Sequence, residues 1–276
     1  MSAPTSVSGG RAGRNLPAAT AVGVGLLSLI TASLFLLRPA FVAIAMAASF
    51  FAVRELSQAL ASRNRHVVRE VAFPAAVVIP LVAYCYSAEV SLAVFAAAVV
   101  AIAALRLRGG VERYFEDFAA SVLVVAYVPL LVGFATSMSA GASGAERVIA
   151  MVLLTAGNDT GGYAAGVFFG KHPIAPSISP KKSWEGLVGS LVLQSLVGAF
   201  VVPMLLDVAV WQGVALGLVM SITATIGDFA ESAIKRDLGV KDMSQALPGH
   251  GGFMDRLDSL LINALVAWIA FGWMGV

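Results

Sequence analysis

Long apolar runs, separated by short polar connections, follow one another from residue 17 to the end of the chain. A helix needs about 20 apolar residues to cross the roughly 30 Å hydrocarbon core of a bilayer. Runs of about that length occur near residues 17–37, 39–60, 67–86, 88–106, 118–139, 145–170, 186–206, 208–228 and 257–275. Arg54 and Glu55 interrupt the second run, which makes it the weakest. The pattern predicts about nine transmembrane helices.

Composition agrees with a polytopic, all-α membrane protein. Hydrophobic residues make up 59% of the chain and charged residues 12%, far from the usual composition of soluble domains. The runs are continuous and rich in Ala and Leu, without the alternation that a transmembrane β-barrel requires. The single cysteine, Cys85, lies in an apolar run, which excludes an intrachain disulfide and predicts a buried side chain.

Basic residues are concentrated in alternate connections, and this predicts the orientation in the membrane. The clusters are Arg11 and Arg14; Arg63, Arg65 and Arg69; Arg106, Arg108 and Arg113; Lys171, Lys181 and Lys182; and Lys235, Arg236 and Lys241. By the positive-inside rule, the N-terminus and every even-numbered connection are cytoplasmic. We therefore expect a multi-pass protein of the cell (inner) membrane with its active site facing the cytoplasm.

Polar side chains are distributed unevenly, which suggests a division of the chain. Residues 1–15 are expected to form a flexible cytoplasmic tail. Residues 16–140 contain transmembrane helices with few polar side chains and suit a scaffold or a dimer contact. Residues 141–276 carry three polar segments and are expected to form the catalytic region.

The first polar segment is GNDTGGYAAGVFFGKHPIAPSISPKKSWEG, residues 157–186. Asp159 lies in an apolar span, where an ionised residue costs about 2.5 to 3.5 kcal/mol near the bilayer centre, so it must face a wet cavity, a metal ion or a partner. Glycines at every fourth position leave one helix face bare for a close helix neighbour or a ligand: Gly162, Gly166 and Gly170.

The same segment ends in a Pro- and Ser-containing loop before the next span. Lys181, Lys182 and Ser183 at the start of that helix suit an anion such as phosphate. The two lysines alone are equally well explained by the positive-inside pattern.

The second polar segment is GDFAESAIKRDLGVKD, residues 227–242. If the eighth span continues as a helix, Asp228, Glu231, Ser232 and Lys235 line one face, at offsets of three, four and seven residues. Two acids, a hydroxyl and a lysine suit a metal ion and a phosphate. A solvated helix end is the alternative interpretation.

The third polar segment is PGHGGFMDRLDS, residues 248–259, just before the last span. PGHGG predicts a glycine-rich turn that exposes backbone N–H groups. Asp255, Asp258 and Ser259 share a face at the start of the helix. A helix cap is the alternative role for one of the two aspartates.

Together the three polar segments indicate a protein that binds and acts on a phosphorylated substrate and depends on Mg²⁺. Carboxylates are hard oxygen ligands for Mg²⁺, while lysine, arginine and glycine amides donate to phosphate oxygens. The chain has no Cys–His metal set, no GxxxxGK[ST] loop and no kinase signature, which argues against an ordinary ATPase or kinase domain. No nucleic-acid partner is expected.

Residues 232–258, SAIKRDLGVKDMSQALPGHGGFMDRLD, resemble the signature of phosphatidate cytidylyltransferases, also called CDP-diacylglycerol synthases. That pattern is S-x-x-K-R, four residues, K-D, then P-x-H-G-G-x-x-D-R-x-D. NDTGGYAAGVFFGK and SISPKKSWEG also resemble blocks of the family, so the likeness covers about residues 155–276. KDMSQALPG departs from the Ser-Gly that often follows Lys-Asp in bacterial members.

The resemblance implies that CTP and phosphatidate react to give CDP-diacylglycerol and pyrophosphate, with Mg²⁺, optionally K⁺, in a homodimer. It also implies a paired metal site on Asp228 and Asp255. Because Asp159 and Asp258 are also negatively charged, we expect them to act as further metal ligands or as hydrogen-bond acceptors beside the ligands. Candidates for contacts to phosphate oxygens are Lys181, Lys182, Lys235, Arg236, Lys241 and Arg256, with His250 as a donor to pyrophosphate. Ser183, Ser232, Asp242, Gly251 and Gly252 complete the expected substrate-binding set.

The physical chemistry of the implied reaction fits these residue types. Phosphatidate supplies its own nucleophile, a phosphomonoester oxygen that is largely ionised at pH 7, so no protein nucleophile is needed. The protein has to hold two anions in line and neutralise the charge on the α-phosphate and the departing pyrophosphate.

Two alternatives remain from the sequence. One is a CTP-dependent enzyme that acts on another lipid, such as a polyprenol kinase or a CDP-archaeol-type synthase. The other is an ion-coupled transporter in which Asp159, Asp228 and Asp255 bind the coupling ion. A transporter predicts repeated halves, and the sequence shows no convincing internal repeat.

Overall fold

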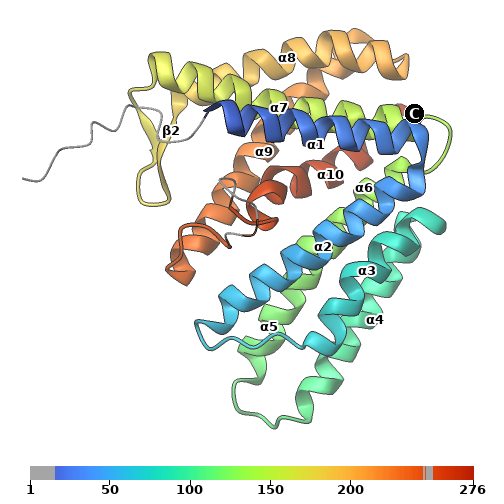
Figure 1. Cartoon of the computed structure of the whole chain (residues 1–276), viewed down its shortest axis with the longest axis vertical. Helices are drawn as coiled ribbons and strands as arrows, with labels where there is room; N and C mark the ends of the chain where they lie inside the picture. The colour runs from blue at the N-terminus through green and yellow to red at the C-terminus, as the bar shows by residue number, and fades with distance from the viewer. Residues whose placement is uncertain (1–15, 245, 247–250) are drawn as a thin grey trace, which may run out of the picture.

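A computed structural model describes residues 16–244, 246 and 251–276. The described chain is helical except for one short β-hairpin and the connections, which confirms the all-α class (Figure 1). The tail predicted for residues 1–15, and His250, lie outside the described residues. In chain order the helices are α1 (Leu16–Leu36), α2 (Arg38–Ala61), α3 (Arg69–Cys85), α4 (Ala88–Leu107), α5 (Tyr114–Val125), η1 (Ala126–Leu130), α6 (Leu131–Ser139), α7 (Gly144–Phe169), α8 (Trp184–Leu206), α9 (Val210–Leu238) and α10 (Met254–Met274).

Within the part of the chain that the structure describes, six helices are long and apolar enough to cross a membrane. They are α2, α4, the continuous rod of α5, η1 and α6, and α8, α9 and α10. The helix α3 has only 17 residues, and α7 carries Asn158 and Asp159 in its second half. The protein is therefore a multi-pass membrane protein, while nine spans and a cytoplasmic N-terminus stay predictions.

Two apolar cores hold the helices together. One joins α2, α3 and α5 through residues such as Leu56, Ile79 and Val124. The other joins α6, α7 and α10, for example through Phe134 and Leu154. Many large apolar side chains outside these cores are exposed, as expected for surfaces that face lipid.

The expectation for Cys85 was wrong. The side chain is exposed at the C-terminal end of α3 rather than buried. In a membrane protein an apolar helix face packs equally well against lipid or protein, so an apolar run does not predict burial.

Glycines bring α7 and α8 into close contact. A Cβ atom on Gly161 would lie 2.6 Å from the Gly189 carbonyl oxygen, and one on Gly162 would lie 2.7 Å from the Ser190 hydroxyl. On the predicted glycine face, Gly166 likewise lies against Gly186 of α8. The bare face therefore receives a helix, which confirms the packing interpretation of these glycines.

Polar side chains connect α7, α9 and α10 inside the helix bundle. Ser221 donates a hydrogen bond of 3.0 Å to the Asn158 side-chain oxygen. Asn263 donates to the Thr155 hydroxyl at 2.9 Å and accepts from the Thr223 hydroxyl at 2.7 Å. Such bonds contribute about 0.6 to 2 kcal/mol each inside a membrane protein. They fix the part of α7 that carries Asp159.

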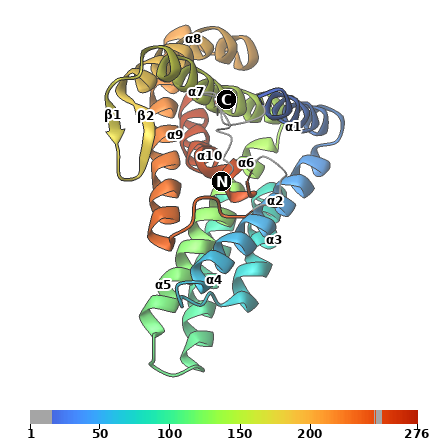
Figure 2. The same ribbon diagram turned by 60° about the vertical axis from the view of Figure 1, so that its left-hand side comes forward.

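The loop expected between the sixth and seventh predicted spans forms an antiparallel β-hairpin instead. Its strands are β1 (Pro173–Ala175) and β2 (Ser179–Ser183). The register pairs Pro173 with Ser183 and Ala175 with Ser179. The hairpin lies beside α9 in Figure 2, and Arg236 of α9 donates to the Ile178 carbonyl oxygen at 3.3 Å.

The base of the hairpin is fixed at the start of α8. The Glu185 carboxylate accepts hydrogen bonds from the backbone N–H groups of Lys171 and His172, at 3.1 and 3.2 Å. The Ser183 hydroxyl accepts from the Gly186 N–H at 3.1 Å and caps the helix. Together these bonds position the lysines of β2 next to α7 and α9.

Candidate functional site

A cavity of about 550 Å³ lies where α7, the hairpin, α8, α9 and α10 meet. This volume is within the usual range for ligand-binding pockets. Its charged lining residues are Asp159, Lys181, Lys182, Asp228 and Arg256, and its lining also includes Asn158, Ser179, Ser183, Ser190 and Thr225. All three polar segments of the sequence contribute to this cavity.

An ion pair between the hairpin and α9 crosses the cavity. The Lys182 ammonium contacts the Asp228 carboxylate, with side chains 31% and 19% exposed, respectively. The same ammonium lies 5.0 Å from the centre of the Phe229 ring, close enough for a cation–π interaction. Both side chains remain partly exposed at the cavity, although the Lys182 Nζ atom itself is buried.

Two further carboxylates lie near Asp228. Gly227 allows α9 to approach α10 so closely that an added Cβ atom would lie 2.8 Å from the Asp258 carbonyl oxygen. This approach brings the Asp258 side chain against Asp228, and Asp159 lies within electrostatic range on α7. Carboxylates this close repel one another unless a cation or a proton lies between them.

This acidic group fits the way in which proteins hold Mg²⁺. Among the residues that the structure describes, no group of three or more His, Cys, Asp or Glu side chains forms a ready-made metal cage. Magnesium is usually held by one or two carboxylates together with substrate phosphates and water. Asp228 and Asp258 offer that donor set beside a cavity that is large enough for phosphates.

Asp255 has a different environment from Asp228. Its side chain is 6% exposed and accepts from the Lys235 ammonium at 2.8 Å. Its second oxygen accepts from the backbone N–H groups of Met243, at 3.1 Å, and Gly252, at 2.7 Å. Each of the two aspartates thus pairs with its own lysine. The paired metal site on Asp228 and Asp255 stays a prediction, and the structure gives Asp255 the contacts of a positioning residue.

Gly251 is required beside this carboxylate. Its φ of +78° is a left-handed conformation, and an added Cβ atom would lie 2.7 Å from an Asp255 carboxylate oxygen. The Gly252 N–H is already bonded to Asp255. The glycine-rich turn therefore supports Asp255 here, and contacts between its N–H groups and a substrate stay predictions.

Lys235 joins α9 to α10. Its side chain is 13% exposed and pairs with both Asp255 and Glu231, the latter 1% exposed and one helical turn earlier. The predicted stripe on α9 is thus a real helix face, with Asp228 at the cavity, Glu231 buried, and Lys235 half-buried and paired with Asp255 of α10.

Lys235, Gly251, Gly252, Asp255 and Asp258 do not line this cavity, and the remaining predicted site residues also lie outside its lining. They are Arg236, Lys241 and Asp242, which are exposed, and Ser232, which is half-buried. Their contacts with a substrate stay predictions, and His250 is not among the described residues.

Residues 17–274 match the cytidylyltransferase family. The chain belongs to this family. The phosphatidate cytidylyltransferase of Mycobacterium leprae is 38% identical over 283 residues, which cover 94% of this chain and 88% of that protein. That of Mycobacterium tuberculosis is 37% identical over 281 residues, which cover 94% of this chain and 83% of that protein. As a cytidylyltransferase, the enzyme transfers a cytidylyl group and must bind a nucleotide and its acceptor together.

Glu55 of α2 is a residue of the cytidylyltransferase whose role the sequence did not reveal. It interrupts an apolar run, yet its side chain is buried, and both of its carboxylate oxygens accept hydrogen bonds. The carboxylate accepts hydrogen bonds from the Ser244 hydroxyl at 2.6 Å, the Phe253 N–H at 3.1 Å and the Met254 N–H at 2.9 Å. It thereby caps the start of α10 from the N-terminal half of the chain. The signal in the sequence for a role of Glu55 was the presence of a single acidic residue within an apolar span.

Replacing Glu55 by Ala is expected to destabilise the cytidylyltransferase by about 2 to 4 kcal/mol, because three donors, of which the Met254 N–H is buried and two are half-buried, lose a charged acceptor. Thermal unfolding in detergent measures this. Glu70→Ala is the matched control, since Glu70 is exposed in the first turn of α3. Equal unfolding temperatures for Glu55→Ala and the control would show that the cap contributes nothing.

Proposed function

We propose that this cytidylyltransferase uses CTP and phosphatidate to form CDP-diacylglycerol and pyrophosphate at the cytoplasmic face of the cell membrane. The observation that carries the proposal is the cavity in which Lys182 and Asp228 meet, between helices of a membrane protein. The mycobacterial relatives named phosphatidate cytidylyltransferase match nearly the whole chain. A site for a lipid phosphate and a nucleotide requires this combination of charge and membrane location.

The basic side chains of the cavity suit the phosphates of both substrates. Lys181 and Lys182 enter from the hairpin and Arg256 from α10. In the reaction, a phosphomonoester oxygen of phosphatidate forms a bond to the α-phosphorus of CTP. The bond between that phosphorus and the bridging oxygen breaks, and pyrophosphate leaves. Fixed cations hold the two anions together and neutralise the charge that develops on the leaving group.

The acidic side chains suit magnesium. Asp228 and Asp258 would hold the ion with oxygens from the CTP phosphates, and Asp159 would add negative charge nearby. Bound Mg²⁺ supplies charge neutralisation as a Lewis acid. In the absence of substrate, Lys182 compensates Asp228; an arriving phosphate gives this lysine a new partner and leaves the carboxylate available to the ion.

Apolar groups in the lining of the cavity suit a lipid acceptor. Tyr163 of α7, Ile174 of β1 and Leu187 of α8 line it together with the charged residues. Phe168 and Val188, on the same two helices, are exposed large apolar side chains. A phosphate can therefore reach the charges while acyl chains remain against apolar helix surfaces.

Transfer of label from cytidine-labelled CTP into a lipid fraction tests the proposed acceptor. The purified protein in detergent is supplied with phosphatidate, a polyprenol or an ether-linked archaeal-type phosphate lipid, and with γ-labelled CTP in parallel. We expect cytidine label in lipid with phosphatidate. Transfer of only the γ-phosphate to polyprenol, or cytidylyl transfer only to the ether lipid, would replace the proposal with one of its alternatives.

Replacing Lys182 by Gln is expected to lower kcat/KM by about 10- to 100-fold, because a charge-assisted bond to a phosphate contributes about 1.5 to 3 kcal/mol. Steady-state pyrophosphate release measures the effect. Lys171→Gln is the control, since Lys171 is exposed at the base of the hairpin and does not line the cavity. Equal values for the two variants would remove Lys182 from the substrate site.

A further inference from the structure

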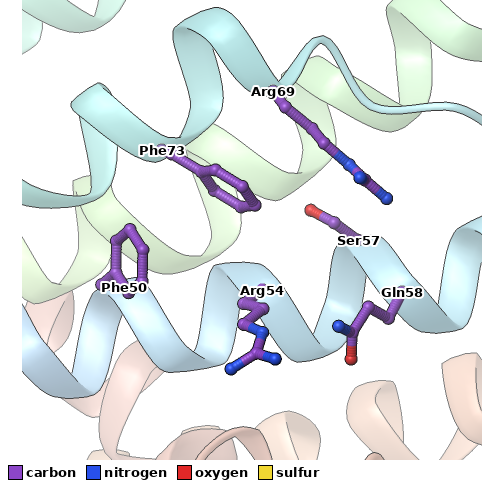
Figure 3. A pocket seen from close by; sticks show the side chains of 6 residues that line it. All are labelled: Phe50, Arg54, Ser57, Gln58, Arg69 and Phe73. Carbon is purple, nitrogen blue, oxygen red and sulfur yellow. The ribbon is translucent and has the colours of Figure 1, made fainter.

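A second pocket, of about 320 Å³, lies between α2 and α3. It is lined by Phe50, Arg54, Ser57, Gln58, Arg69 and Phe73, which are shown in Figure 3. None of these residues lines the cavity described above. We call it the α2–α3 pocket, and nothing in the proposed reaction requires it.

Two arginines give the α2–α3 pocket its positive charge. Across the described ranges of the chain, the ion pairs involve neither Arg54 nor Arg69. Glu55, next to Arg54 in sequence, points to the start of α10 and is fully engaged there. The pocket therefore has two cationic groups without an internal counter-charge, which suits an anion.

A buried hydroxyl gives a second, independent sign of a ligand. Ser57 is 2% exposed, and its Oγ has no hydrogen-bond partner within the described protein. Leaving such a group unpaired is costly, so buried hydroxyls normally find a partner. Figure 3 shows Arg69 extending from α3 toward Ser57 on α2. A ligand oxygen between these side chains would satisfy the hydroxyl and the guanidinium together.

The other end of the α2–α3 pocket is aromatic. The rings of Phe50 and Phe73 have centroids 5.4 Å apart and belong to facing helices. The connection between α2 and α3, residues 62–68, is rich in basic residues. Basic connections next to apolar helices are typical of the cytoplasmic membrane surface. Cationic groups beside an aromatic surface suit a phosphate that is attached to acyl chains.

We propose that the α2–α3 pocket binds the headgroup phosphate of an anionic phospholipid, at a site separate from the reaction cavity. Arg69 contacts the phosphate oxygens, and the Ser57 hydroxyl donates a hydrogen bond to one of them. Arg54, whose side chain points away from α3 in Figure 3, turns toward the phosphate when the lipid binds. The start of the acyl chains lies against Phe50 and Phe73. The pocket volume accommodates a headgroup, while the chains extend into the membrane.

Native mass spectrometry of the full chain in detergent, with added phosphatidylglycerol or phosphatidylcholine, tests the proposal. We expect Arg54→Gln with Arg69→Gln to retain phosphatidylglycerol at least about 10-fold more weakly than the wild type. Ser57→Ala, which keeps the charge, should weaken retention by a smaller factor. The matched control is Arg108→Gln with Lys171→Gln, which removes two exposed positive charges. Size-exclusion profiles show whether each variant is folded.

Loss of phosphatidylglycerol in the arginine variant but not in the control supports the proposal. Equal retention by the two variants, or equal binding of phosphatidylcholine and phosphatidylglycerol by the wild type, overturns it. A further arm adds inorganic phosphate at millimolar concentration. Displacement of phosphatidylglycerol by this phosphate would identify a site for free phosphate and overturn the assignment to a lipid.

Discussion

Replacing Asp228 by Ala is expected to lower kcat by at least about 100-fold, with the protein still folded. The loss follows from removing a carboxylate that meets both Lys182 and the neighbouring acids at the proposed reaction cavity, because preorganised charge is usually the largest source of catalysis. We expect the protein to stay folded because the Lys182 side chain, which loses its partner, is 31% exposed and can turn toward solvent. Pyrophosphate release and thermal unfolding, measured on the same preparation, separate the two effects.

Asp237→Ala is the matched control for this experiment. Asp237 lies on the same helix, but its side chain is 63% exposed and pairs with Arg65 away from the cavity. The control should retain nearly normal activity. Near-normal activity of Asp228→Ala would instead exclude this carboxylate from the metal site.

Replacing Lys235 by Met is expected to destabilise the protein by about 3 to 5 kcal/mol. Lys235 is the common partner of Glu231 and Asp255, whose side chains are almost completely buried. Removing the lysine leaves two buried carboxylates close together, and Asp255 keeps only its backbone donors. Thermal unfolding in detergent measures the loss.

A second variant distinguishes this charge effect from the loss of packing. Adding Glu231→Gln to Lys235→Met removes one of the uncompensated carboxylates and should restore part of the stability. If the double variant is less stable than Lys235→Met, the buried charges do not cause the destabilisation. Residual activity well below the unfolding temperature then reports whether Lys235 also acts on the substrate.

The helices could be predicted well because hydrophobic length is a local property. The eighth predicted span continues as a helix through Asp228 and Lys235 to Leu238. The prediction that Asp228 and Lys235 lie on one helix face depended on this continuation. The second span is a continuous helix despite Arg54 and Glu55. The charges of Arg54 and Glu55 made this the weakest of the predicted spans. The sequence did not show that the Glu55 carboxylate accepts hydrogen bonds at the start of α10.

The sequence predicted which types of residue form the candidate site, but it did not predict which of these residues form ion pairs with one another. Asp159, Lys182, Asp228 and Arg256 do meet at one cavity. Which lysine pairs with which aspartate depends on how the hairpin and α10 pack against α9, and spacing along the chain does not contain that information. The hairpin itself was expected as a loop, since its strands lack the apolar alternation that usually marks them.

The two halves of the chain are coupled more closely than a scaffold and a catalytic region would suggest. Glu55 of α2 caps the helix that carries Asp255, Arg256 and Asp258. The proposed lipid pocket contains Arg54, the preceding residue. The N-terminal half thus helps to position α10.

The most direct test of the proposed reaction is pyrophosphate release by the detergent-purified protein with CTP, phosphatidate and Mg²⁺. Each component is omitted in turn, Mg²⁺ is removed by chelation, and ATP replaces CTP in a control. We expect release only when all three components are present. Release without phosphatidate, or no release by a protein that is demonstrably folded, would contradict the assignment of phosphatidate as the cytidylyl acceptor.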